Sequence, residues 1–332
     1  MAQMKYFYEL TISSSPHAHS PVTTQTIMRD VLIALIPAML GSIYFFGFRS
    51  LLVTLVSAAA CVFFEWGFCK VRKLHCKTYD LSAVVTGVLL AFVCPVTIPY
   101  WTIILGDFFA IVLVKMLFGG LGKNIVNPAL AGRAFLFSWP VLMSNWVKVG
   151  FDNAAGLLST ADAVTAATPM SAMHQGALPE ESILDMFLGN IGGCIGETSA
   201  LLLIIGFLYL LYRKVITARI PLAYIDTVAI LAFLFPQGND RIAWMAAQVF
   251  GGGLMLGAIF MATDYVTSPL TKLGQIVYGI GCGIITILIR YFGGYSEGVT
   301  YAILCMNACS VLLDKIGRPV KFGAPKKEAA KK

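Results

Sequence analysis

Ten long apolar runs, each with at most two charged side chains, divide this chain of 332 residues. A helix needs about 20 mostly apolar residues to cross the roughly 30 Å hydrocarbon core of a bilayer. The runs reach or approach that length, and they cover residues 31–48, 50–69, 80–96, 99–118, 128–147, 192–212, 220–236, 242–262, 273–292 and 298–314. We therefore predict an all-α fold, namely a polytopic membrane protein with about ten transmembrane helices.

The composition excludes the other broad classes. Apolar and aromatic side chains make up 58% of the chain and charged ones only 12%, against a charged share of about 25% in soluble domains. The net charge of +7 is spread over short loops and a tail, which argues against nucleic acid as a partner. Several runs are short and carry proline or glycine at their ends, so we expect some short or broken helices: Pro95, Pro99, Pro128, Pro236, Gly192, Gly193 and Gly196.

Lysine and arginine predict the orientation. With ten spans both termini lie on one side, and all basic residues except Arg49, Lys148, Arg241 and Arg290 fall on that side. The positive-inside rule makes this side the cytoplasm, and no secretory signal peptide is expected in the first thirty residues. We predict a multi-pass protein of the bacterial cytoplasmic (inner) membrane. Its expected parts are a cytoplasmic segment 1–30, a membrane domain 31–314 with an external loop at about 149–190, and a basic cytoplasmic tail 315–332.

The cysteines and histidines predict no metal or haem centre. No Cys-x-x-Cys pair occurs among the eight cysteines, and most of them lie inside apolar runs, as small buried hydrophobes do. One weaker alternative is a metal shared with another subunit, because Cys305 and Cys309 share a helix face and Cys94 and Cys194 could join them. All four histidines lie outside the runs, so two of them cannot ligate a haem within the membrane.

Three polar stretches interrupt the apolar pattern. The stretch 118–133 could hold a polar ligand such as a ring system, or be a tight interhelical turn, and its relevant residues are Gly119, Gly120, Gly122, Asn124 and Asn127. The stretch 260–271 contains Asp264, which, like Glu197 and Asp314, is expected either on a cation route or as a boundary residue that caps a helix. The external stretch 159–170 is rich in small residues and hydroxyls.

Two acids lie deeper in the apolar runs. An unpaired charge there costs about 2.5–3.5 kcal/mol on insertion scales. We therefore expect Glu65 and Asp107 each to face protein, to pair, or to bind a cation. Lys115 lies two helical turns beyond Asp107 and cannot pair with it directly.

Taken together, these stretches resemble the RnfD and NqrB family of membrane flavoprotein subunits. The first apolar run begins near residue 31, without the longer N-terminal extension of NqrB, so the RnfD branch is the closer resemblance. Seven motifs in order carry it: Ser15-Pro16-His17, residues 27–38, residues 80–91, residues 119–132, Gly196-Glu197-Thr198-Ser199, residues 260–269 and residues 297–304.

The resemblance implies a subunit of a respiratory complex that passes electrons between ferredoxin and NAD⁺ and moves sodium ions or protons. The family attaches FMN as a phosphoester to the last threonine of Asp-x-x-Ser/Thr-Gly-Ala-Thr, which maps onto Asp162, Thr165 and Thr168, with Ala166 where the family has glycine. A noncovalent riboflavin is also implied, for which Gly119–Pro128 is the candidate segment. Expected partners are the other membrane and peripheral subunits, a flavin transferase and membrane lipid.

One other class shares the expected architecture. A channel or secondary transporter for a small polar solute, with a fold like that of urea and ammonium transporters, would also show ten spans with short helices. Thr168 would have no role in such a protein. A purely structural anchor is disfavoured, because buried acids are costly features for a scaffold.

Overall fold

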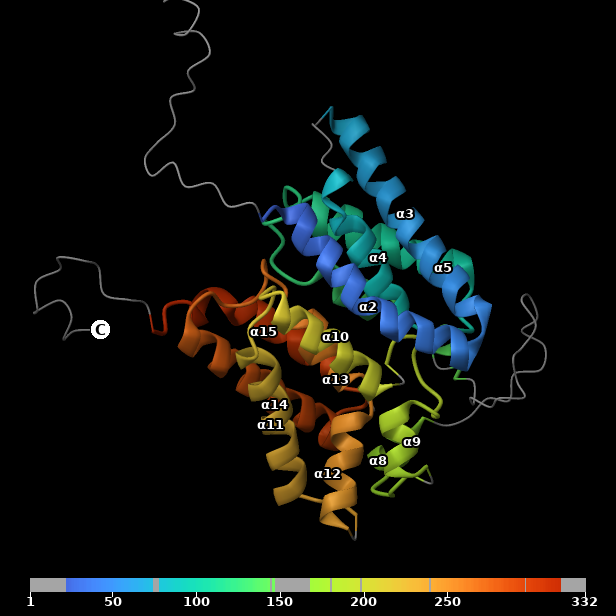
Figure 1. Ribbon diagram of the computed structural model, residues 1–332, viewed down its shortest axis with the longest axis vertical. Helices are drawn as coiled ribbons and strands as arrows, with labels where there is room; N and C mark the ends of the chain where they lie inside the picture. Colours follow the sequence, from blue (N-terminus) through green and yellow to red (C-terminus); the bar gives the residue numbers. More distant parts are fainter. Residues whose placement is uncertain are drawn as a thin grey trace, which may run out of the picture.

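The described part of the chain is helical throughout, with no strand among its elements (Figure 1). This computed structural model describes residues 22–73, 78–143, 145–146, 168–179, 181–197, 199–238, 240–295 and 297–317. In Figure 1 helices α2 to α5 lie together in the upper part, and α10 to α15 lie below them. Helices α2 and α10 pack against each other and join the two groups.

The first half contains two long helices followed by shorter ones. Its elements are α2 (Thr24–Phe46), α3 (Phe48–Arg72), the 3₁₀ turn η1 (Thr78–Asp80), α4 (Ser82–Phe92), α5 (Tyr100–Phe108), the π-helix η2 (Phe109–Met116), α6 (Pro128–Leu136) and α7 (Pro140–Met143). Thr23 begins α2 with a capping box. The helix thus starts before residue 31, where the sequence predicted the membrane domain to begin. Gly47, at φ 77°, separates α2 from α3.

The second half is more broken. Its elements are α8 (Pro169–His174), α9 (Ile183–Leu188), α10 (Ala200–Tyr212), α11 (Arg219–Leu234), α12 (Arg241–Phe250), α13 (Leu254–Leu256), the π-helix η3 (Gly257–Met261), α14 (Lys272–Phe292) and α15 (Val299–Leu313). The segments Arg241–Phe250 and Leu254–Met261 are bent relative to each other by 57°.

Fewer helices than predicted are long enough to span a bilayer. Within the described ranges three are long and apolar enough, namely α2, α3 and α14, and the bent pair of α12 and Leu254–Met261 makes a fourth if it is one span. The prediction of ten spans is therefore not confirmed, although each predicted run contains at least one helix. The run 128–147, for example, holds the nine-residue α6 and the four-residue α7. Short and broken helices were expected.

Hydrogen bonds explain why short helices are tolerated. After α4 the chain turns into an irregular buried segment, where the Arg49 guanidinium donates to the carbonyl oxygen of Val96 at 2.8 Å. The backbone N–H groups of Ile195 and Gly196 donate to the carbonyl oxygens of Cys94 and Phe92. Irregular backbone at membrane depth is stable only where protein satisfies it in this way.

The outer surface is apolar. Large hydrophobic side chains on α2 and α3 are more than half exposed, among them Leu40, Tyr44, Leu55 and Phe63. An apolar surface of this extent is unfavourable in water but suits lipid. With the apolar spans, it identifies a multi-pass membrane protein.

Close approach of α2 and α10 depends on Gly206. A methyl group added there would clash with the carbonyl oxygen of Ala34 and meet Phe260 Cζ at 3.0 Å. We expect Gly206→Ala to lower the stability of the purified protein by about 1–3 kcal/mol, the usual cost of overpacking. Thermal unfolding in detergent measures this. Gly67→Ala in α3 is the control, because its added methyl group meets nothing within 4 Å, and an unfolding temperature lowered equally by both changes would contradict the prediction.

Candidate functional site

A cavity lies where the ends of several helices meet. It is lined from α2, from α4, from η2, and from the segments 121–129 and 260–266. Most of its wall is apolar, and its polar side chains are Ser82, Thr86, Lys115, Asn124, Asn127, Thr263 and Asp264. A mostly apolar pocket with a few placed polar groups is typical of a cofactor site.

Both π-helices reach this cavity. Lys115 of η2 lines it, as does Phe260 of η3, and Thr263 and Asp264 follow η3 directly. π-Helical turns are rare and often occur at functional sites.

Lys115 connects the cavity to Glu65, a buried acid whose neighbour cannot be identified from the sequence. Its Nζ lies 3.2 Å from Glu65 Oε2 and donates to Ser82 Oγ at 2.7 Å. The Ser82 hydroxyl in turn donates to Asp80 Oδ1 at 2.6 Å. The lysine is therefore a buried cation with one carboxylate partner, and it contacts Glu65 rather than Asp107. Of the three alternatives expected for Glu65, pairing is the one that the structure shows.

The two predicted asparagines both line the cavity. Asn127 Oδ1 accepts from Ala129 N at 3.0 Å and so caps α6, while its Nδ2 donates to Met261 O at the end of η3. Asn124 Nδ2 donates to Val126 O at 3.2 Å, but its buried Oδ1 has no partner in the described part of the chain. An unsatisfied acceptor in a cavity wall is a place where a ligand N–H or O–H can bind.

The three predicted glycines do not line the cavity. Gly119, Gly120 and Gly122 have φ of 110°, 87° and 90°, values that glycine adopts without strain. They shape the turn between η2 and the asparagines. The stretch 118–133 was expected to be either a ligand site or a tight turn. The glycines form the turn, and the asparagines line the cavity.

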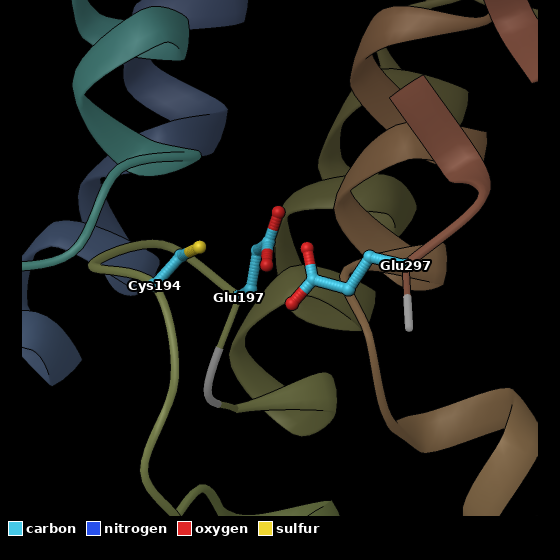
Figure 2. A group of neighbouring side chains, drawn as sticks. All are labelled: Cys194, Glu197 and Glu297. Carbon is cyan, nitrogen blue, oxygen red and sulfur yellow. The ribbon is translucent and has the colours of Figure 1, made fainter. Parts of the chain in front are cut away.

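A second polar cluster surrounds Arg133 of α6, a fully buried side chain. Its Nη1 lies 3.2 Å from Glu197 Oε1 and 3.1 Å from Thr300 Oγ1, and its Nη2 lies 2.5 Å from Glu297 Oε2. Figure 2 shows Glu197 and Glu297 pointing toward one another from opposite segments, with Cys194 alongside. This arrangement ties α6 to the segments before α10 and before α15.

These same groups could offer ligand atoms to a metal. The ligand atoms of Cys194, Glu197 and Glu297 all lie within 4.8 Å of one another. Arg133 contacts each of the three residues, and its Nη2 lies 3.5 Å from Cys194 Sγ. The guanidinium therefore already supplies the positive charge that two buried carboxylates require.

A second buried arginine stabilises the break between α12 and α13. Arg290 of α14 donates to the carbonyl oxygens of Gln248 at 2.6 Å and Gly251 at 3.1 Å. These carbonyls end α12 and have no partner within the helix. On the other side of the break, a side chain at Gly253 would clash with the Glu197 carboxylate. Arg290 thus lies at the end of α12, and Glu197 lies at the start of α13.

The three predicted cation residues have different neighbours. Glu197 belongs to the Arg133 cluster, and Asp264 lines the cavity, where its Oδ2 accepts from Thr267 Oγ1 at 3.1 Å. Asp314 accepts from Leu270 N at 2.7 Å, ahead of α14. The structure does not bring these three acids together in one site.

Thr168 begins α8 and is 6% exposed. Its side chain makes no capping hydrogen bond. The following helix packs on the break near Arg290: His174 Nδ1 lies 2.9 Å from Arg290 O, and a side chain at Gly252 would meet Met170. The sequence places Thr168 in the external stretch 159–170, and the structure buries its side chain. Asp162 and Thr165 lie outside the described residues.

The four cysteines named for a metal shared with another subunit differ in their surroundings. Cys94 and Cys194 are fully buried, whereas Cys305 is exposed on α15 and Cys309 is partly exposed. Five of the cysteines in the described ranges are buried, in line with their expected role as small hydrophobes.

Sequence reasoning missed the partners of the charged residues. Arg133 is the last residue of the stretch 118–133, and nothing in that stretch points to Glu197 and Glu297 as its partners. Lys115 and Glu65 are 50 positions apart. Two charges of opposite sign inside apolar runs are a signal that they pair, but the sequence does not say which ones meet.

Comparison with known proteins gives one consistent result. The model of the NQR2, RnfD, RnfE family matches residues 11–323. One relative, from the sodium-translocating ferredoxin:NAD⁺ oxidoreductase complex of Acetobacterium woodii, is a subunit 46% identical over 96% of this chain and 96% of its own. A subunit of the proton-translocating ferredoxin:NAD⁺ oxidoreductase complex of Clostridium ljungdahlii is 44% identical over 94% and 96%. A subunit of the ion-translocating oxidoreductase complex of Actinobacillus succinogenes is 34% identical over 93% and 96%.

Proposed function

The chain belongs to the NQR2, RnfD and RnfE family, and on that premise we propose that it is the RnfD-type subunit of an ion-translocating ferredoxin:NAD⁺ oxidoreductase complex. The observation that carries the proposal is that its similarity to subunits of such complexes extends over nearly the full length of both chains. Coupling ions of both kinds, Na⁺ and H⁺, occur among these relatives, so the similarity favours neither.

The protein acts together with other subunits. Its sequence contains no iron–sulfur motif and no nicotinamide-binding fingerprint, so other membrane and peripheral subunits must deliver and remove the electrons. We place it in the bacterial inner membrane with both termini in the cytoplasm, on the distribution of lysine and arginine. The basic tail 315–332 is then available to anionic lipid.

We further propose that FMN is attached to Thr168 as a phosphoester, by a flavin transferase. Two features of the threonine support it. Its hydroxyl makes no capping bond, and α8 anchors it on the buried break near Arg290. Because the side chain is 6% exposed, the transferase must reach it before α8 packs as it does here. Bound FMN would supply redox chemistry, and the task of the surrounding residues would be to hold it at a fixed position.

Fluorescence in a denaturing gel tests this attachment. After coexpression with a flavin transferase, the wild-type band is expected to fluoresce under ultraviolet light and the Thr168→Ala band to be dark, because only a covalent flavin survives denaturation. Ser171→Ala is the matched control: its hydroxyl donates to the Thr168 carbonyl at 2.7 Å, and its loss leaves the attachment oxygen in place. A dark wild-type band, or a fluorescent Thr168→Ala band, would refute the assignment.

The cavity is our candidate for the noncovalent riboflavin. Its walls are mostly apolar, which suits a ring system, and the Asn124 Oδ1, which has no partner among the described residues, can accept from a ligand donor. Lys115 supplies a positive charge at the cavity wall. The residues present thus fit a flat heterocycle with a few hydrogen-bonding groups. Thr168 does not line this cavity, so the two flavins would occupy separate sites.

Ion movement requires a cation site whose affinity or access changes with the redox state. Asp264, Glu197 and Asp314 are our candidates. Asp264 has the strongest support because it lines the proposed flavin cavity. A cation at Glu197 would have to displace the Arg133 guanidinium.

A further inference from the structure

One buried acid has no basic partner. Asp107 lies near the end of α5 and is 0% exposed. Its Oδ1 accepts from Ser57 Oγ at 2.7 Å and from Cys61 Sγ at 3.2 Å, both on α3. Its Oδ2 has no hydrogen-bond partner among the residues that the structure describes. Within the described residues no lysine, arginine or histidine forms an ion pair with it.

The other buried acids of the bundle contrast with it. Glu65 is paired with Lys115, and Glu197 and Glu297 are both paired with Arg133. A carboxylate without such a partner is strongly unfavourable at membrane depth, and its neutral form is favoured instead. The geometry therefore requires either a proton or a bound metal cation on Asp107.

The surroundings favour the proton. A hard metal cation needs several oxygen ligands and space for them. The oxygens that the hydrogen bonds bring near are Ser57 Oγ and, beyond it, the Gly87 carbonyl oxygen, which lies 2.8 Å from Ser57 Oγ. Asp107 lines neither the cavity beside Lys115 nor the two hollows bordered by Phe63 and by Met39 in the described part of the chain. A proton needs no such space.

Polar groups extend from Asp107 in both directions along α3. Ser50, Thr54, Ser57, Cys61 and Glu65 follow one another at helical spacing, and all are buried on the side of α3 that faces the protein. The outward side carries Leu55, Phe63 and Trp66. Hydroxyl and thiol groups can both donate and accept, so this face could pass a proton to and from Asp107. The π-helix η2 begins two residues after Asp107.

We propose that Asp107 holds a proton in the resting protein and is a proton-exchanging site inside the membrane. The titratable and charged groups on the elements packed around it are Cys61 and Glu65 on α3, Lys115 on η2, Arg133 on α6 and Cys94 after α4. Of these, Glu65, Lys115 and Arg133 are paired with other groups, and only the Cys61 thiol contacts Asp107. Its protonation is independent of the proposed flavins, whereas a role in ion movement rests on the proposed function.

Dicyclohexylcarbodiimide tests the protonation, because it adds only to a protonated carboxyl group. The acid proton moves to a carbodiimide nitrogen and the carboxyl oxygen bonds to the central carbon. In native membranes that contain the intact complex, mass spectrometry is expected to find the adduct on Asp107, more of it as the pH is lowered. Glu65, held as an anion by Lys115, is the internal control and is expected to remain unmodified. Asp107→Asn removes the adduct and Asp107→Glu restores one at the same position.

Three outcomes would overturn the proposal. One is an unmodified Asp107 at every pH in the intact wild-type complex, a result that does not depend on whether any variant assembles. Another is protection of Asp107 by added Na⁺ at constant pH, which would make sodium the occupant. The third is a modified Asp107 together with an assembled Asp107→Asn complex that acidifies vesicles at the wild-type rate, which would remove the exchange role. The adduct forms without electron transfer, so a failed oxidoreductase assignment would leave the labelling result unchanged.

Discussion

Replacing Arg133 with methionine is expected to prevent the chain from accumulating as a stable subunit. The substitution removes the one cation between Glu197 and Glu297, whose carboxylates lie 3.2 Å and 2.5 Å from its guanidinium nitrogens. Removing one partner from a buried ion pair costs about 3–5 kcal/mol, because the remaining charge stays buried without compensation. That is comparable with the whole stability of many domains. The measurement is the amount and unfolding temperature of the subunit in detergent.

Neutralising the two acids tests this explanation. In Arg133→Met with Glu197→Gln and Glu297→Gln no unpaired charge remains, so most of the stability is expected to return. Arg213→Met is the matched control. Its side chain is 45% exposed, its partner Asp30 is 7% exposed, and the paired nitrogen and oxygen lie 3.1 Å apart. Because water reaches one side of this pair, we expect a smaller loss than for Arg133, whose cluster has no side chain more than 11% exposed. If the triple variant were as unstable as the single one, the cluster would act through shape rather than charge.

The sequence predicted the helical membrane class because apolar runs of near-spanning length have few other stable folds. It did not predict how many runs are continuous helices. The run 242–262 contains no charged side chain, yet its helix is bent at Gly251, Gly252 and Gly253. Arg290, which satisfies the carbonyls at that bend, belongs to a different helix. A break of this kind depends on a distant partner, and local pattern alone cannot supply it.

The candidate site, like the fold, could be predicted from the sequence only in part. Asn124 and Asn127 could be selected from sequence, because polar residues between apolar runs need a reason to be there. Lys115 could not be connected to Glu65, since the two helices that carry them could face each other in many ways. Thr168 illustrates a further limit. The sequence shows that Thr168 precedes Pro169. The burial of its side chain depends instead on the packing of α8 on the break at Gly251 and Gly252, which is a tertiary contact.

We expect Lys115→Met to produce two losses at once, in stability and in the noncovalent flavin. The substitution leaves Glu65 as a buried carboxylate without its cation, 3.2 Å from the lost nitrogen, at a cost of about 3–5 kcal/mol. It also removes the positive charge from the cavity wall. Acid precipitation of the purified complex separates the two flavins, because a covalent flavin stays in the pellet and a noncovalent one is released. Flavin in the supernatant is expected to fall at least about tenfold, the effect of roughly 1.4 kcal/mol of lost binding energy.

The double variant Lys115→Met with Glu65→Gln distinguishes the two losses. It contains no unpaired charge, so its unfolding temperature is expected to return close to that of the wild type. The cavity still lacks its cation, and the released flavin is therefore expected to remain low. Recovery of both stability and released flavin would mean that Lys115 serves only to neutralise Glu65 and that the cavity holds its ligand through the asparagines and the apolar wall. A stable double variant that has lost only the released flavin would instead assign Lys115 to the ligand, since a structural role alone predicts that both properties recover together.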